Sequence, residues 1–474
     1  MIVALVVACA FFMETFTGTV ITTALPAMAR SFGSDPVRLS LGVTAYMLSL
    51  AIFIPLSGWV ADRFGSRTVF RAAIGLFTLA SVFCGLSDNL AELVLARVVQ
   101  GVGGAMMVPV GRLVMFRSVD RSEYVRAMAW MTVPAFVGPI VGPPVGGFIT
   151  TYLTWRWVFF LNVPIGLLGM VLVTYLIENY REPVARPLDW LGFVLSGVSL
   201  ASILYSLDLA AHGSLGDVLG FAALLAAGLV IGALAVLHAL RHPTPLLNLS
   251  LFRLPTFALS VWGGLFFRTS AGSIPFLLPV FLQVGLGMTA FVSGILIFAD
   301  AIGNCAMNAV APAALRRFGF RTVVVWNAVI SAAGMAASSA FDANTPHAVI
   351  FAAFFFFGFM RSLQYNALST LQYADIPAFE LSGATSLAQM VQQLCSGTGV
   401  ALGAVLLQLM LVLRGAGAES LGARDVRVVF IVIGLFALPS LLFFLRLGAD
   451  AGAELVAPRA AARNSIAAPS ADSS

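Results

Sequence analysis

Apolar runs of about twenty residues alternate with short polar segments along most of the chain. A helix needs roughly 20 apolar residues to cross a bilayer, whereas a strand of a membrane barrel reads as about 10 residues of alternating polarity. The pattern therefore predicts an all-α, multi-pass membrane protein. Its fourteen expected spans are residues 3–28, 39–61, 68–87, 90–114, 125–149, 157–178, 188–208, 217–239, 255–283, 290–313, 321–340, 347–372, 382–413 and 426–446.

The two ends of the chain differ from the rest of this pattern. The first apolar stretch has no basic residue before it and continues to Ala29 with Glu14 inside it. We therefore expect a first spanning helix with no cytosolic arm before it, rather than a secretory signal peptide. Beyond residue 446 the composition turns to Ala, Pro, Ser and Arg, which predicts a disordered cytoplasmic tail over 447–474.

The distribution of charge orients the predicted helices. The chain is 60% hydrophobic and 10% charged, and its formal net charge is +5. All 26 basic residues are arginine and most fall in short loops, which indicates membrane topology rather than nucleic-acid binding. With the N-terminus in the cytosol, sixteen loop arginines lie inside and six outside. This bias predicts that both termini are cytoplasmic.

A basic phrase occurs twice in the chain. Residues 63–70 read RFGSRTVF and residues 317–324 read RFGFRTVV, after the second and the tenth predicted helix. A parallel repeat at this offset fits the two halves of an alternating-access carrier, and chance similarity between arginine-rich loops is the alternative. We expect a six-helix bundle over 1–180, a two-helix insert over 181–250 and a second six-helix bundle over 251–446.

The first copy of the phrase belongs to a longer loop motif. Gly65 can adopt positive φ in a tight turn, the arginines can bind anionic headgroups, and Asp62 can cap a helix or pair with a cation. The string resembles the cytoplasmic-loop signature of the major facilitator superfamily, which implies a conformational switch. A loop that only anchors topology is the alternative. In the second copy Arg316 replaces Asp62. The switch candidates are Gly58, Asp62, Arg63, Gly65, Arg67 and, on the fourth helix, Arg112.

Two further motifs lie on the fourth and fifth helices. Arg97 sits about 10 Å along its helix, and an arginine at such depth usually faces the protein interior or an aqueous cavity. Together with Gln100 it resembles the superfamily's Arg-x-x-Gln-Gly pattern, which implies proton coupling; a structural arginine is the alternative. The fifth helix resembles the antiporter motif of exporters, with a packing kink as the alternative. Its motif residues are Gly138, Gly142, Pro143, Gly146 and Gly147.

The first helix resembles that of the fourteen-helix drug:proton antiporters. Residues 13–26 read METFTGTVITTALP, where the family usually reads L-D-x-T-I-V-N-V-A-L-P. Thr17 therefore takes the position of the family's aspartate. Glu14 lies one turn earlier on nearly the same face, and an acid inside the membrane is a functional candidate by default. We expect Glu14 to supply the missing carboxylate, with Thr17 in the same cavity.

The second half offers its own polar groups. Asp300 and Asn304 share one face of the tenth helix because they are four residues apart. Arg268 and Arg361 lie within the ninth and twelfth helices. Asp300 is expected either to pair with one of these arginines as a structural bridge or to take part in coupling, and the sequence leaves this choice open.

Several kinds of chemistry are not expected. The chain lacks a phosphate-binding loop and any lysine to complete one, its four cysteines lie singly in apolar segments, and its four histidines are isolated. We therefore expect neither an enzyme, a cofactor nor a metal site, and no nucleic-acid partner. The resemblance implies a monomeric, lipid-embedded antiporter of a bacterial inner membrane that uses the proton gradient to export amphipathic or cationic small molecules. The alternatives are an exporter of one metabolite or lipid, and a non-transporting sensor or scaffold.

Overall fold

The computed structural model describes residues 2–34, 36–118, 124–179, 181, 187–212, 218–243, 245–376, 380–415 and 421–448. Those residues form helices joined by short loops, and no strand occurs among them. Thirteen of the described helical stretches are long and apolar enough to cross a membrane. One more helix, α6 (Tyr124–Tyr152), is 29 residues long. The expected all-α architecture of fourteen spanning helices is confirmed, while the predicted tail from residue 449 onward lies outside the described residues.

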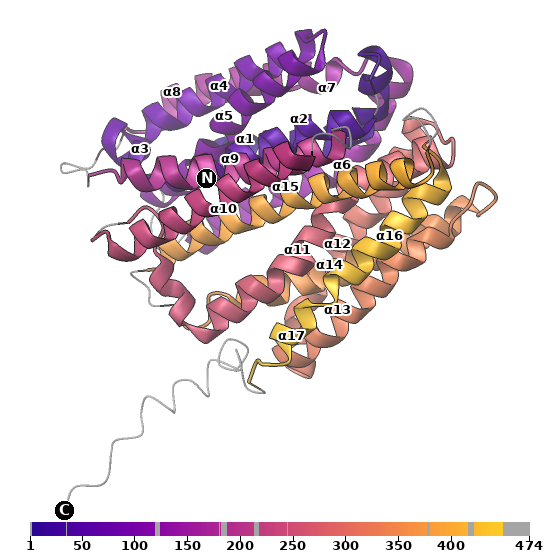
Figure 1. Cartoon of the computed structure of the whole chain (residues 1–474). Coiled ribbons are helices and arrows are strands. Elements are labelled where there is room, and N and C mark those ends of the chain that lie inside the picture. Colours follow the sequence, from indigo (N-terminus) through magenta and orange to yellow (C-terminus); the bar gives the residue numbers. More distant parts are fainter. Residues whose placement is uncertain are drawn as a thin grey trace, which may run out of the picture.

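The first half of the chain forms one bundle, drawn in indigo and purple in Figure 1. α1 packs along α6, while α4 packs along α5 and α8. Besides α6, its helices are α1 (Ile2–Ser31), α2 (Pro36–Phe53), α3 (Ser57–Phe64), α4 (Ser66–Leu86), α5 (Leu90–Ser118), α7 (Trp157–Phe160) and α8 (Asn162–Leu176).

The second bundle is drawn from salmon to yellow and lies below the first in Figure 1. α12 packs along α14, and α11 packs along α15. Its helices are α11 (Pro255–Val280), which continues into a π-helical turn over Phe281–Gly285, α12 (Ala290–Phe318), α13 (Phe320–Ala337), α14 (His347–Leu371), α15 (Leu381–Leu413), α16 (Ala423–Ala437) and α17 (Ser440–Phe444).

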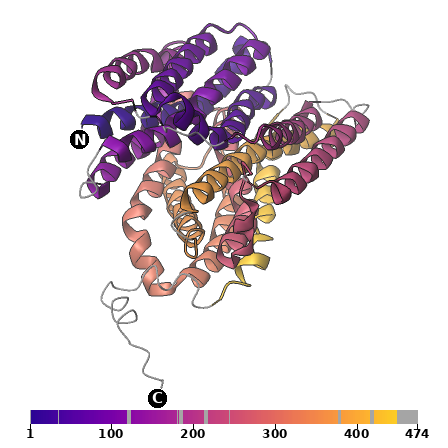
Figure 2. The same cartoon turned by 90° about the vertical axis from the view of Figure 1, so that its left-hand side faces the viewer.

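Two inserted helices, α9 (Trp190–His212) and α10 (Val218–Arg241), connect the bundles. α9 packs against α2 and α15, whereas α10 packs mainly on α9. Figure 2 shows this magenta pair at the edge of the molecule. A short 3₁₀ segment (Leu249–Arg253) then leads into α11. The insert therefore covers one side of the seam between the bundles without separating them.

The two bundles meet along the helix pairs α6–α12 and α2–α15. The α6–α12 crossing is close because glycines face backbone carbonyls. A Cβ added at Gly147 would lie 2.4 Å from the Ala290 carbonyl oxygen, and one added at Gly294 would lie 2.3 Å from that of Pro143. Helices that approach so closely need small residues at the contact. Part of the glycine-rich fifth-helix motif thus builds the contact between the halves.

Proline divides three of the predicted helices. Pro55 lies in a 3₁₀ turn between α2 and α3, Pro164 follows the break between α7 and α8, and Pro439 separates α16 from α17. The proline ring clashes with the carbonyl four residues earlier and offers no N–H donor. Hydropathy predicted continuous spans here because it measures the length of an apolar run and not the continuity of its backbone.

The repeated basic phrase makes the same turn in both bundles. Gly65 joins α3 to α4 with φ 94°, and Gly319 joins α12 to α13 with φ 74°. The positive φ expected for Gly65 is confirmed. We call the end of the molecule that holds these two glycines the α3 end, and the opposite end, which holds α7, the α7 end.

Candidate functional site

A cavity of about 360 Å³ lies between the two bundles. Helices α1, α2 and α6 line one side, and α11, α12, α14 and α15 line the other. Carriers built from two repeats bind their cargo at the interface between the repeats, so this cavity is the candidate substrate site. Its polar side chains are Thr19, Thr22, Asp300, Asn304, Arg361, Tyr365 and Ser396.

Asp300 and Arg361 supply the charge of the cavity wall. Arg361 Nη2 lies 2.5 Å from Asp300 Oδ2, with 14% and 13% of the two side chains exposed. Their helices can come close because Gly358 has no side chain. A Cβ added at Gly358 would lie 2.1 Å from the Asp300 carbonyl oxygen. The sequence left the partner of Asp300 open between Arg268 and Arg361, and the structure pairs it with Arg361.

A second, smaller space of about 40 Å³ borders the same ion pair inside the second bundle. Both charged side chains line it, as they line the larger cavity. Six aromatic or sulfur-containing side chains form part of its wall. They are Phe267, Met335, Phe354, Phe357, Met360 and Phe430. The ion pair therefore stands between a mixed polar cavity and an aromatic recess.

Of the other two candidate residues in the second half, Asn304 lines the cavity and Arg268 is buried in the core. Asn304 lines the cavity, as expected. Arg268 does not: it is 1% exposed, and its Nη2 donates to Gln372 Oε1 at 3.1 Å. Its Nε and Nη1 atoms have no hydrogen-bond partner within the part of the chain that the structure describes. Arg268 is thus a buried cation away from the candidate substrate site.

The antiporter-like motif of α6 packs against a row of threonines on α1. A Cβ added at Gly138, Gly142 or Gly146 would lie 2.2–2.3 Å from a threonine hydroxyl oxygen. The facing pairs are Gly138–Thr15, Gly142–Thr19 and Gly146–Thr23. Pro143 lines the cavity beside this row. One side of α6 therefore touches α1 and another touches α12, so a movement of α6 would be transmitted to both halves.

Glu14 and Thr17 both lie on α1, but their side chains have different neighbours. Thr17 is fully buried and donates to Asn162 Oδ1 on α8 at 3.0 Å. Glu14 lies within electrostatic range of Tyr46 and Arg112, and its buried Oε2 has no hydrogen-bond partner among the described residues. Neither residue is part of the described cavity wall. Three residues turn a helix by about 300°, and this offset is enough to separate the two side chains.

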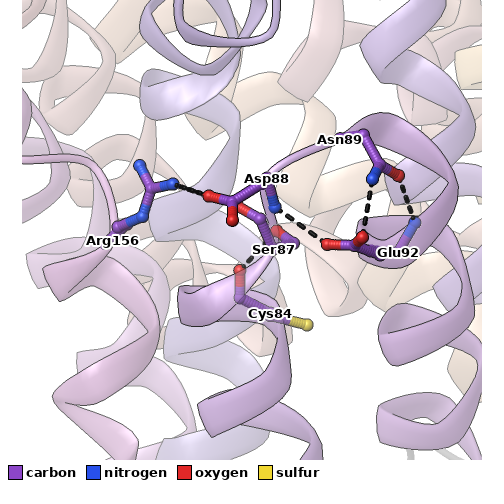
Figure 3. Close-up of polar contacts among 6 residues, drawn as sticks. All are labelled: Cys84, Ser87, Asp88, Asn89, Glu92 and Arg156. Carbon is purple, nitrogen blue, oxygen red and sulfur yellow. Dashed lines mark hydrogen bonds and ion pairs between the residues drawn. The ribbon is translucent and has the colours of Figure 1, made fainter.

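The start of α5 is held by a set of polar contacts at the turn from α4 (Figure 3). Asn89 Oδ1 accepts the Glu92 N–H at 2.9 Å, and Glu92 Oε2 accepts the Asp88 N–H at 2.9 Å. Asp88 also pairs with Arg156 at 2.8 Å. Such reciprocal contacts satisfy free donors at a helix N-terminus. They set where α5 begins, and hence how deep Arg97 lies.

Arg97 is fully buried and held by neutral groups. Its Nε donates to the Gly42 carbonyl at 3.1 Å and its Nη1 to Gln100 Oε1 at 2.5 Å. Gln100 Nε2 in turn donates to Ser81 Oγ at 2.7 Å. The guanidinium carbon lies 4.0 Å from the centre of the Tyr46 ring, a cation–π arrangement. Among the described residues no carboxylate forms an ion pair with Arg97.

The switch candidates gather at the α3 end. Gly65 sits against Asn179, whose side chain would be 2.5 Å from an added Cβ, and Arg67 Nη1 donates to the Ile177 carbonyl at 3.3 Å. Arg112 lies within electrostatic range of both Glu14 and Tyr373, the latter from the second bundle. Gly58, Asp62 and Arg63 lie on α3. Arg112 is thus a switch candidate with titratable groups of both halves in its electrostatic surroundings.

The expectation of isolated histidines is wrong for one pair. Asp189, His238 and His242 place one potential ligand atom each within 4.8 Å of the others. Burial alone would raise the pKa of Asp189, but hydrogen bonds from the Gly192 N–H, His238 and the Leu246 N–H lower it below its ordinary value. The signal was present in the sequence as His-x-x-x-His, a spacing that puts both rings on one helical face.

Comparison with known proteins agrees with this architecture. The sequence profile of the Major Facilitator Superfamily matches residues 7–400. MdtD of Pectobacterium carotovorum subsp. carotovorum (strain PC1), named as a multidrug resistance protein, is 36% identical over 460 residues, which is 96% of this chain and 97% of that protein. The MdtD protein of Citrobacter koseri (strain ATCC BAA-895 / CDC 4225-83 / SGSC4696) is 39% identical over 403 residues, or 85% of each chain.

Solved structures of transporters share the fold. A D-xylose-proton symporter superposes with a TM-score of 0.66 at 14% identity and covers 95% of this chain and 98% of its own. An auto-inhibited peptide transporter of the POT family gives 0.67 at 14% identity, with 94% and 97% covered. Two six-helix bundles, a cavity between them and the loop motif in both halves lead to the same conclusion as these comparisons. The chain belongs to the major facilitator superfamily and is a membrane transporter, not an enzyme.

Proposed function

We propose that this chain is a proton-coupled antiporter that exports amphipathic cations from a bacterial cell by alternating access. The observation that carries the proposal is the Asp300–Arg361 ion pair in the wall of the cavity between the bundles. A paired carboxylate inside a membrane protein marks a position where a charge is needed and can be exchanged. The MdtD relatives carry names of multidrug resistance proteins, which supports the export of drugs.

Asp300 has two partners in this mechanism. Arg361 neutralises it in the structure and again in the return step, and a cationic substrate would neutralise it in the loaded carrier. In the larger cavity beside the ion pair, Met47, Leu278 and Ile297 offer an apolar surface for the body of an amphipathic molecule. Aromatic faces also attract cations directly. The site therefore favours molecules that combine a positive charge with an apolar ring system.

Glu14 is our candidate for the proton site. Its buried Oε2 has no hydrogen-bond partner among the described residues, and a buried carboxylate is costly to keep charged without donors around it. Tyr46, which stacks on Arg97, lies within electrostatic range of it. Glu14 would thus take up and release the proton inside the first bundle while Asp300 holds the substrate in the cavity, so one carboxylate serves each cargo.

The two bundles contact each other at the α7 end. Gln283 Nε2 donates to the Thr23 carbonyl at 3.1 Å, and the Phe291 N–H donates to Thr151 Oγ1 at 3.1 Å, each across the two bundles. Phe148 packs on Phe291 with ring centres 6.3 Å apart. We assign the α3 end to the cytosol from the arginine bias. In this assignment the α7 end is the outer end, and the contacts that close it must break for export.

The test is transport in proteoliposomes with an imposed pH gradient and ethidium as a fluorescent cation. Wild type is expected to move ethidium against the proton flow. Asp300→Asn should abolish ethidium binding, and Glu14→Gln should leave binding intact but make flux independent of the gradient. Asp342→Asn is the matched control, because Asp342 lies in an exposed loop and bonds to Thr345. It should behave like wild type.

Each contrary outcome indicates a different function of the protein. Flux that ignores the gradient in wild type rejects proton coupling. Failure of several unrelated lipophilic cations to compete with ethidium rejects multidrug export and indicates an exporter of one compound. Absence of any flux, with Glu14→Gln and Arg97→Ala indistinguishable from wild type in cells, indicates a sensor or scaffold.

A further inference from the structure

We propose that Asp189, His238 and His242 form a binding site for Zn²⁺ that fastens the start of α9 to the end of α10. The site lies in the two-helix insert, away from the cavity between the bundles. It is independent of the proposed transport function, because its test needs only the folded protein and the metal ion.

The three side chains converge from two helices. Asp189 directly precedes α9, His238 lies in the last turn of α10, and His242 directly follows that helix. His238 Nε2 is 2.7 Å from Asp189 Oδ1, and the two imidazole rings have centres 5.1 Å apart. One potential ligand atom of each residue lies within 4.8 Å of the other two. Imidazole nitrogens and a carboxylate oxygen are ligands that Zn²⁺ commonly takes.

The separations fit coordination after a small adjustment. Zn²⁺ binds nitrogen and oxygen at about 2.0–2.2 Å in tetrahedral geometry, which puts neighbouring ligand atoms roughly 3.3 Å apart. The Asp189 and His238 atoms are closer than this because a hydrogen bond joins them, and the ligand atom of His242 lies within 4.8 Å of both. Metal binding would replace that hydrogen bond, and side-chain rotation would bring the three atoms to coordination distance.

Asp189 is already oriented as a ligand would be. Its Oδ1 accepts the Gly192 N–H at 2.8 Å, and its Oδ2 accepts the Leu246 N–H at 3.2 Å. Its side chain is only 3% exposed. Backbone donors that hold a ligating carboxylate are a regular feature of metal sites. A cavity of about 190 Å³ borders Asp189, together with Ser196 and Ser199 among others, and neither histidine is part of its wall.

A simple hydrogen bond between Asp189 and His238 is the competing explanation. That bond needs one histidine, whereas the structure brings the second ring of the His-x-x-x-His pair to the same carboxylate. A bound ion would join α9, α10 and, through Leu246, the segment that leads into α11. The insert would then be anchored at its α3 end by the metal.

The experiment uses the full chain, purified in detergent without a histidine tag and stripped with a chelator. Zn²⁺ binding is measured by equilibrium dialysis with metal analysis, and Co²⁺ is used as a spectroscopic probe of the same site. Wild type should bind one Zn²⁺ per chain, give the visible absorption of tetrahedral Co²⁺, and unfold at a higher temperature with Zn²⁺ than without.

His242→Gln is the decisive variant, because it removes one ligand and leaves the Asp189–His238 hydrogen bond. We expect its Zn²⁺ affinity to fall by about tenfold or more, with loss of the Co²⁺ spectrum and of the thermal shift. His347→Gln, at the exposed start of α14 on the opposite end of the molecule, is the matched control and should bind as wild type does. Equal binding by wild type and His242→Gln, or less than one ion per wild-type chain, would overturn the proposal.

Discussion

Asp300 of α12 and Arg361 of α14 form an ion pair, with 2.5 Å between Oδ2 and Nη2, in the wall shared by the central cavity and the aromatic recess. The pair lies within one bundle, so it does not hold the two halves together. It is therefore free to open for a substrate without requiring the bundles to separate.

Removing one partner of this pair should destabilise the protein more than removing both. In Arg361→Gln the carboxylate of Asp300 loses its donor, and we expect the free energy of unfolding to fall by about 1–3 kcal/mol. The double variant Asp300→Asn, Arg361→Gln should recover part of this loss, because no unpaired charge remains. Thermal unfolding of the purified variants measures both effects. If the double variant is less stable than Arg361→Gln, the pair does not act as a charge-neutralising unit.

Adding one methyl group to the α6 motif should force α1 away. A Cβ at Gly142 would lie 2.2 Å from Thr19 Oγ1, and overpacking of this kind costs about 1–3 kcal/mol. Gly142→Ala should lower the unfolding temperature, and adding Thr19→Ala should restore part of it by removing the hydroxyl group. Gly18→Ala on α1 is the control, since nothing lies within 4 Å of its added Cβ. Equal destabilisation by Gly18→Ala would show that the α1–α6 contact is not responsible.

The two turn glycines should differ in how they tolerate alanine. Both have positive φ, which costs a residue with a Cβ about 1–2 kcal/mol. Only Gly65 has a neighbour in the way, the Asn179 side chain, whereas Gly319 has open space. Gly65→Ala should therefore be the less stable variant, and Asn179→Ala in that background should bring it level with Gly319→Ala. Identical unfolding temperatures for the two single variants would contradict this.

The two copies of the repeated loop differ at Asp62 and Arg316, and this difference should affect the transport rate. Asp62 is half-buried on α3, whereas Arg316, its counterpart in the second copy, is exposed at the end of α12. We expect Asp62→Asn to lower the transport rate by about tenfold or more, because a half-buried carboxylate at this loop can control how the halves move, and Arg316→Ala to change it by less than about twofold. Rates are compared at equal amounts of reconstituted protein. Equal rates would show that the asymmetry has no functional role.

Most of the fold could be predicted from the sequence because a bilayer leaves few options. Long apolar runs must become helices there, since backbone groups have no water to bind. The repeat of RFG-R-TV predicted two related halves, and Gly65 and Gly319 both have positive φ at this turn. The glycines of α6 indicated close packing. The structure adds what they touch: Thr15, Thr19 and Thr23 of α1 on one side, and α12 on the other.

The sequence pattern could not predict which candidate side chains lie close together, because that depends on the three-dimensional packing of the helices. Glu14 and Thr17 were expected to share a cavity, but helix rotation sends Thr17 to Asn162. Arg268 and Arg361 were equivalent candidates for Asp300 until packing of α12 on α14 brought only Arg361 near. Asp189 and His238 are far apart in sequence yet 2.7 Å apart in space.

The sequence by itself determined that the chain is a fourteen-helix membrane protein with two related halves, because hydropathy and motif repetition are properties of order along the chain. Only the tertiary structure decided which polar groups face one another, since that depends on how each helix is rotated and how closely it packs. In an apolar surrounding every polar side chain must find a partner across a helix interface. The choice of partner follows from packing geometry, not from spacing in the sequence.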